Sequence, residues 1–157
     1  MAIYLKIDGI DGDVTAEGHE GWIECASMQW GVGRGIHTPT GSAQERESSA
    51  PSVSEVSVAT AMNKATPLLF TEACVGKSKL VKLDLVQTGE ALETYMSYEL
   101  SDSLISGYSM SSGGERPSES VSFNFTKIEM KYIPYDNKHE AQSPIPAGYD
   151  ISLGKKV

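Results

Sequence analysis

The stretch that decides the fold runs from residue 121 to residue 133 and reads Val121-Ser122-Phe123-Asn124-Phe125-Thr126-Lys127-Ile128-Glu129-Met130-Lys131-Tyr132-Ile133. Apolar and polar side chains alternate along it, which is the pattern of a β-strand with one buried face. The alternation changes parity near Thr126 and Lys127, and such a slip is typical of a β-bulge. Because bulges bend strands, the stretch predicts a sheet that curves and closes into a barrel.

Segments with a similar alternation occur through the rest of the chain. They cover residues 3–8, 22–32, 53–62, 80–87, 95–104 and 105–110, and the pattern partly returns at 147–154. The 157-residue chain has 15 glycines and 39% hydrophobic residues, a composition that suits many short strands joined by turns. We therefore expect a mainly β fold: a compact β-barrel of two packed sheets with one short flanking α-helix and a long polar loop.

One helix is predicted in the middle of the chain. Thr66 is the expected N-cap, Pro67 takes the first helical position and Gly76 ends the helix. Apolar residues at three- and four-residue spacing predict one buried stripe, made of Leu69, Phe70, Ala73 and Cys74. A helix of about nine residues is too short to be stable alone, so we expect it to dock on the strands.

Two polar segments interrupt the strands. Residues 33–51 have almost no large apolar side chains, and a loop of this length in a compact domain is usually functional or disordered. Residues 136–146 are polar, hold two prolines and predict a mobile linker. We expect a single domain over residues 1–157, with a polar linker and a short tail after about residue 134.

The charge of the chain argues against a nucleic-acid partner. Lys and Arg number 13 against 21 Asp and Glu, so the net charge is −8 and phosphate backbones are repelled. Cys25 and Cys74 are expected to be two small buried thiols in a reducing compartment. No secretory signal and no membrane-spanning stretch is visible. We expect the chain to be made in the cytoplasm and to leave, if it leaves, without a cleaved signal peptide.

The sequence predicts no catalytic, cofactor-binding or metal site. Gly76-Lys77-Ser78 resembles the end of a phosphate-binding loop, but Thr71 stands where that loop needs a glycine. His19, His37 and His139 are dispersed in polar segments without a second ligand at metal-binding spacing. Glycine-rich and aspartate-rich turns elsewhere lack the spacing of dinucleotide and calcium sites.

The order of the motifs is similar to that of a known family. Residues 63–69 entering the helix and 73–77 leaving it look like the central segment of the haemolysin-coregulated protein (Hcp) family, and residues 121–132 resemble its last core strand. Residues 5–10, 28–32 and 148–157 add further similarity. The chain departs from the family pattern at Met28 and Tyr149, where tryptophan is frequent. The family prediction rests on the combination of these motifs, which covers most of the chain.

This resemblance implies a barrel subunit that assembles as hexameric rings. The rings stack into the inner tube of a bacterial type VI secretion system, which a contractile sheath surrounds and a spike protein tips. The tube is exported by that system, and its lumen can hold and shield small effector proteins. The resemblance thus implies a structural, non-enzymatic protein whose partners are its own copies, the sheath, the spike and effectors.

Two candidate sites follow for such a subunit. Gln29 lies on the strand face opposite Met28 and Trp30, so if those two are in the core, Gln29 points outward and contacts cargo in the lumen. The polar loop is the candidate ring-stacking contact, through Arg34, Gln44, Glu45, Arg46 and Glu47. A loop of this kind could equally be disordered in isolated rings and order on stacking.

Two other functions stay open from the sequence alone. The first is a monomeric β-barrel that carries a small apolar ligand in an internal cavity. The core is instead expected to be filled, by Phe123, Phe125, Trp30, Leu83 and Leu85. The second is an enzyme, with an unrecognised site or a fused toxin, although only a short tail follows Tyr132.

Overall fold

The computed structural model describes residues 1–44 and 46–157. Its elements in chain order are β1 (Ala2–Ile7), β2 (Ile23–Gln29), β3 (Val32–Gly33), β4 (Ile36–His37), β5 (Glu47–Ser48), β6 (Ser52–Val53), β7 (Val56–Ala61), α1 (Thr66–Val75), β8 (Lys79–Thr88), β9 (Leu92–Ser111), β10 (Ser118–Asn124), β11 (Lys127–Tyr132), β12 (Ile145–Asp150) and β13 (Lys155–Lys156). The expected fold class is confirmed, because the described chain is mainly β with one short helix.

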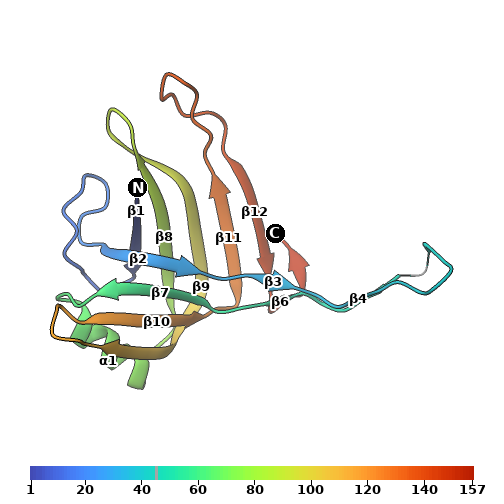
Figure 1. The fold of residues 1–157 in the computed structure, drawn as a ribbon, viewed down its shortest axis with the longest axis horizontal. Helices are drawn as coiled ribbons and strands as arrows, with labels where there is room; N and C mark the ends of the chain where they lie inside the picture. Colours follow the sequence, from blue (N-terminus) through green and yellow to red (C-terminus); the bar gives the residue numbers. More distant parts are fainter. Residues whose placement is uncertain (45) are drawn as a thin grey trace.

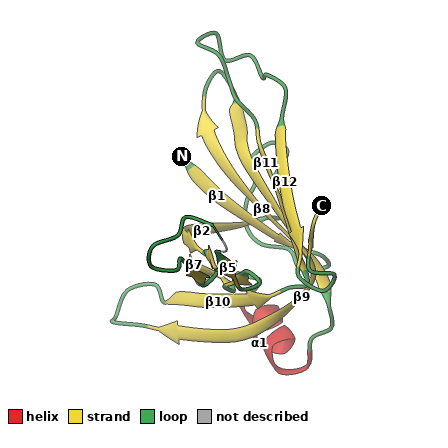
Figure 2. Cartoon of the chain, turned by 90° about the vertical axis from the view of Figure 1, so that its right-hand side faces the viewer, coloured by secondary structure: helices red, strands yellow, loops and turns green. Residues whose placement is uncertain are grey.

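The large sheet closes on itself (Figure 1). Its strands follow the order β10-β7-β2-β1-β8-β9-β11-β12-β13, and β10 also pairs with β9, which completes the circuit. Closure depends on the length of β9: its first half pairs with β8 and β11, and its second half pairs with β10. Asp102, with a φ of 50°, separates the two halves. The opposed parts of one continuous sheet thus form the two layers of the barrel (Figure 2).

The interior of the barrel is filled by apolar side chains. Phe123, Phe125 and Leu83 are buried as expected, together with residues such as Leu5 and Leu100. Trp30 is partly buried and packs against this core, and Leu85 is also only partly buried. The filled interior follows from the alternation of the strands, which directs every second residue toward the barrel axis.

The stretch from residue 121 to residue 133 forms two strands, so the expectation of a single bulged strand is wrong. β10 ends at Asn124 and β11 begins at Lys127. The change of parity itself is present, because Phe125 and Ile128 are both buried. Its physical reason is that β10 and β11 pair with different halves of β9, and the chain turns between them.

A bulge lies instead in the second strand. The register of β2 against β7 shifts between Cys25 and Ser27, which leaves Ala26 as the extra residue. Because of this shift, Ile23 and Cys25 before the bulge and Met28 after it all contact the core. β2 also ends at Gln29, so the expected strand over residues 22–32 is divided.

The helix is where expected, but its cap and its buried face are not. Ala65 is the N-cap, and Thr66 is inside the helix, where its hydroxyl donates a 2.8 Å hydrogen bond to Glu119 and accepts one of 3.1 Å from the Asn63 N–H. Leu69 is 0% exposed and is the buried residue of α1, whereas Phe70 is 59% exposed. Cys74 is exposed rather than buried. The helix thus docks through the buried Leu69 and through the hydrogen bond of Thr66.

The polar loop forms two short pairs of antiparallel strands, and we call it the arm. β3 pairs with β6, and β4 pairs with β5, so residues 32–44 and 46–53 form a narrow ribbon that leaves the barrel and returns to it (Figure 1). Ser49 strengthens it, because its hydroxyl accepts a 2.8 Å hydrogen bond from the Gly35 N–H. Residue 45 lies outside the described part of the chain.

The end of the chain belongs to the large sheet. β12 pairs with β11 from Lys127–Asp150 to Tyr132–Ile145, and β13 pairs with β12. The segment expected to be a linker is tied back by a β-bridge between Tyr135 and Ala141. The boundaries given for the single domain stay a prediction.

Over the described ranges, no helix combines the length and the apolar character that a bilayer crossing requires.

Candidate functional site

One outward surface of the sheet carries small uncharged side chains. Beyond the bulge of β2, the strands β2, β7, β10 and the second half of β9 place alternate residues on the side away from the core. We call these residues the neutral face: Ser27, Gln29, Ser57, Ala59, Ala61, Gly107, Ser109, Ser111, Ser118, Ser120 and Ser122. Since 22% of the chain is charged, a surface of this extent without charge is distinctive.

The outward surface of the other layer has the opposite character. On β1, β8, β11 and the first half of β9 it carries Lys6, Lys82, Asp84, Glu99, Lys127, Glu129 and Lys131. We call these residues the charged face. Two ion pairs lie on it, Lys82–Glu99 at 3.6 Å and Lys127–Glu129 at 2.9 Å. The two layers of strands, whose backbones Figure 2 shows, therefore carry chemically different outward side chains.

Gln29 is exposed on the neutral face. Its neighbours Met28 and Trp30 pack against the core, which leaves the Gln29 side chain on the outer side. It lies opposite Ser57 of β7 and borders an open hollow that is also lined by Trp30, Ser54, Glu55, Ser57 and Ser122. The outward position agrees with the sequence interpretation, and the contact with cargo stays a prediction.

Glu55 stands at the Gln29 end of the neutral face. Its carboxylate accepts a hydrogen bond from the Ser106 hydroxyl, and the Ser106 oxygen lies 3.0 Å from that of Ser122. Glu24, at the opposite end of this face, is exposed before the bulge of β2. The sequence interpretation missed Glu55, although its parity, opposite to that of the buried Val56, signals an outward carboxylate.

The candidate stacking residues lie on the arm. Arg34, Gln44, Arg46 and Glu47 are all exposed, and Glu45 lies outside the described residues. Arg46 Nε donates a 3.1 Å hydrogen bond to the Thr38 hydroxyl across the ribbon. The structure thus gathers Arg34, Gln44, Arg46 and Glu47 on the arm, which projects from the barrel (Figure 1). Their role in stacking stays a prediction.

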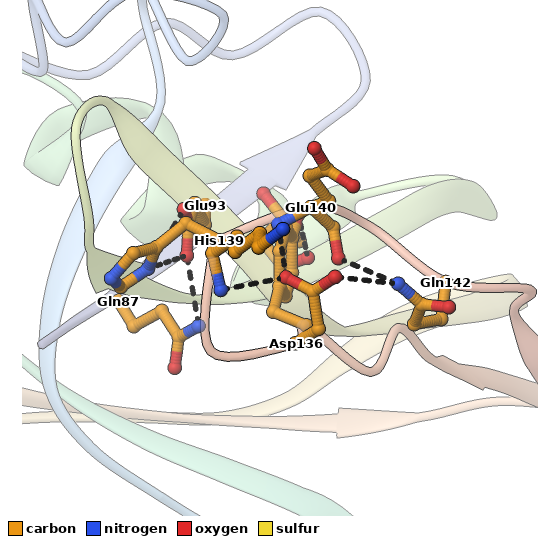
Figure 3. Close-up of polar contacts among 9 residues, drawn as sticks. Gln87, Glu93, Asp136, His139, Glu140 and Gln142 are labelled. Atoms are coloured by element: carbon orange, nitrogen blue, oxygen red, sulfur yellow. Dashed lines mark hydrogen bonds and ion pairs between the residues drawn. The ribbon is translucent and has the colours of Figure 1, made fainter.

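A polar cluster ties the segment after β11 to the end of the β8–β9 hairpin (Figure 3). His139 Nδ1 lies 3.3 Å from Glu93 Oε1, and Gln87 Nε2 donates a 3.0 Å hydrogen bond to Glu93. Asp136 accepts hydrogen bonds from the backbone N–H groups of Lys138 and Glu140. These contacts fix the loop at this end of the barrel, and we interpret the cluster as structural.

Some polar side chains are buried in ways that the sequence interpretation did not foresee, and Glu119 and His19 are two of them. Glu119 is 1% exposed and accepts hydrogen bonds from the hydroxyls of Thr66 and Tyr108, so it joins α1 to β9 and β10. The pKa of Tyr108 is raised to about 12, mainly because the phenol is buried and also because it donates a hydrogen bond to the Glu119 carboxylate. Glu119 shares the parity of Val121 and Phe123, and that signal could have placed it in the interior.

His19 is another of these side chains: it lies in a loop, as expected, but it is buried. Its Nε2 lies 2.8 Å from Asp84 Oδ2, and its ring packs against Tyr4 and Trp22. The loop before β2 therefore covers part of the charged face. Among residues 1–44 and 46–157, no group of three His, Cys, Asp or Glu side chains is arranged to hold a metal ion.

The comparison with protein families finds one family whose model spans β2 to β11. The family model for the type VI secretion system effector Hcp matches residues 4–132, most of the chain. The chain belongs to the Hcp family. This membership confirms the family that the sequence motifs predicted, and it places the Hcp chain among type VI secretion proteins rather than in a family of enzymes.

Solved structures share the Hcp fold over nearly the whole length. A type six secretion system protein has a TM-score of 0.91 at 25% identity, with 99% of each chain covered. Hcp1 from Salmonella typhimurium has a TM-score of 0.80 at 25% identity, covering 99% of this chain and 98% of that one. A type VI secretion system effector from Yersinia pestis has a TM-score of 0.75 at 25% identity, with 94% and 98% covered. No curated protein sequence matches significantly.

Proposed function

We propose that this Hcp chain is a structural subunit of the inner tube of a type VI secretion system. It assembles as hexameric rings that stack, are exported by that system without a cleaved signal peptide, and hold and shield effector proteins in the lumen. Its partners are copies of itself, the contractile sheath, the spike protein and effectors. Membership of the Hcp family supports this proposal, together with the distribution of charge over the barrel.

The observation that carries the proposal is the contrast between the two outward faces. A tube subunit has one surface toward the lumen and another toward the outside. Cargo must leave the lumen again, so the lumen wall should carry few charges, and the neutral face meets this requirement. The charged face then lies outside, where its Lys and Glu side chains can contact the sheath or solvent. This assignment puts Gln29 on the lumen wall.

The arm supports stacking in the same proposal. A two-stranded ribbon is at best marginally stable on its own in water, so contact with a neighbouring ring would stabilise it. Its exposed charged and amide side chains, those of Arg34, Gln44, Arg46 and Glu47, offer hydrogen bonds and ion pairs for that contact. We include Glu45 among the residues proposed to make the contact between rings.

The carrier alternative lacks support in the barrel interior. Phe123, Phe125 and Leu83 are buried there, and Trp30 packs against them. An apolar ligand would have to displace these side chains. The tube subunit is therefore the better interpretation of the barrel.

Retention of effectors by a Gln29→Arg variant tests the role of the neutral face. Each ring would gain six positive charges on the lumen wall, which should abolish co-purification of type VI effectors expressed with it. Thr88→Arg is the matched control, since Thr88 is exposed on the β8–β9 hairpin and the added charge is the same. Rings of unchanged mass that retain every effector as well as the control would count against Gln29 as a cargo contact.

A further inference from the structure

The hollow beside Gln29 combines two kinds of group that attract a cation. Its lining includes Glu55, whose side chain ends in a carboxylate, and Gln29, whose amide carries a carbonyl oxygen. Carboxylate and amide oxygens accept hydrogen bonds from ammonium and guanidinium groups. Trp30 also borders the hollow, but its ring packs against Tyr98 at the core.

The Glu55 carboxylate is positioned but not neutralised. It accepts a hydrogen bond from the hydroxyl of Ser106, which is in turn in contact with Ser122. A hydroxyl orients a carboxylate without cancelling its charge. Among the described residues, no Lys, Arg or His nitrogen lies within ion-pair distance of it. Glu55 is also exposed, so a cation can reach it from solvent.

We propose that Glu55 and Gln29 form a binding site for a lysine or arginine side chain of a cargo protein. The inference rests on the proposed function, in which the neutral face lines the lumen. Repetition around a six-fold ring would place six such sites at one level of a wall that is otherwise uncharged beside them. Six such sites select cargo with a basic surface, and salt weakens the attraction between the carboxylates and the cargo.

Binding of a labelled tetralysine peptide to purified rings tests the site. Fluorescence anisotropy gives the dissociation constant for wild type, Glu55→Gln and Glu24→Gln. The two variants have the same net charge, and Glu24 is exposed at the opposite end of the neutral face. Glu55→Gln should raise the dissociation constant at least five-fold, whereas Glu24→Gln should change it less than two-fold. A labelled tetraserine peptide should not bind to any of the three.

The outcomes separate this inference from the function on which it rests. Equal weakening by both variants, or wild-type rings that do not bind tetralysine, would overturn the cation site and leave the tube subunit intact. Glu55→Gln protein that loses its ring mass in light scattering would assign Glu55 to a contact between subunits, which also overturns the inference. A wild-type protein without rings would refute the proposed function itself.

Discussion

Truncation of Leu69 should destabilise the protein far more than truncation of Phe70 beside it. Leu69 is 0% exposed and packs in the main core cluster, whereas Phe70 is 59% exposed on the outer side of α1. Leu69→Ala leaves a cavity and removes the anchor of a helix that cannot fold alone. Such changes cost about 2–5 kcal/mol. Phe70→Ala should change stability by about 0.5 kcal/mol or less, because surface substitutions usually do.

Urea unfolding followed by circular dichroism measures both variants. With an m-value of about 2 kcal/mol/M, Leu69→Ala should lower the midpoint by about 1–2.5 M, and Phe70→Ala should shift it by about 0.3 M or less. All samples need the same protein concentration, since oligomerisation makes stability depend on it. A Phe70→Ala midpoint as low as that of Leu69→Ala would refute the reasoning, because α1 would then dock through its other face.

Three further outcomes are expected. Glu119→Ala should lower the free energy of unfolding by at least about 1–3 kcal/mol, because the hydroxyls of Thr66 and Tyr108 lose their buried acceptor; a urea midpoint equal to that of wild type would contradict this. The pKa of Tyr108 is raised from 10.0 to about 12, so the contribution of this side chain to stability is complete below pH 10 and is lost as the pH rises through 12. An ultraviolet titration of Tyr108→Phe should lack the phenolate that forms late in wild type. An unchanged titration curve would argue against the shift. Ellman's reagent should label one thiol per native chain at pH 8, because Cys74 is exposed while burial raises the pKa of Cys25 to about 12. The Cys74→Ser variant should lose that label. Persistent labelling of this variant would show that Cys25 is accessible.

The fold class could be predicted because alternation survives in most strands. Val121, Phe123 and Phe125 are buried, as their spacing indicates. The pairing of β10 with β9 could not be predicted, since closure depends on which half of a 20-residue strand each partner meets. The bulge at Ala26 does have a local signal, which the sequence interpretation missed: the apolar parity changes from Ile23 and Cys25 to Met28.

The candidate site was predictable in part. Gln29 could be placed outward because large apolar residues flank it, and the structure shows it exposed. The neutral face was not foreseen, since it needs the cross-strand neighbours of four strands that are far apart in the chain. Thr66 was taken for an N-cap because hydroxyl residues favour that position, yet its hydroxyl is used by Glu119, which is 53 residues away. Tertiary hydrogen bonding therefore overrode a local preference.

The mass of the purified protein in solution tests the central claim most directly. Multi-angle light scattering distinguishes one chain of 16.9 kDa from a closed ring, which for six copies has a mass of about 101 kDa. The proposed tube subunit predicts a peak near the mass of the ring, with longer stacks at high protein concentration. A monomer at every concentration would contradict the ring and, with it, the assignment of the neutral face to a lumen.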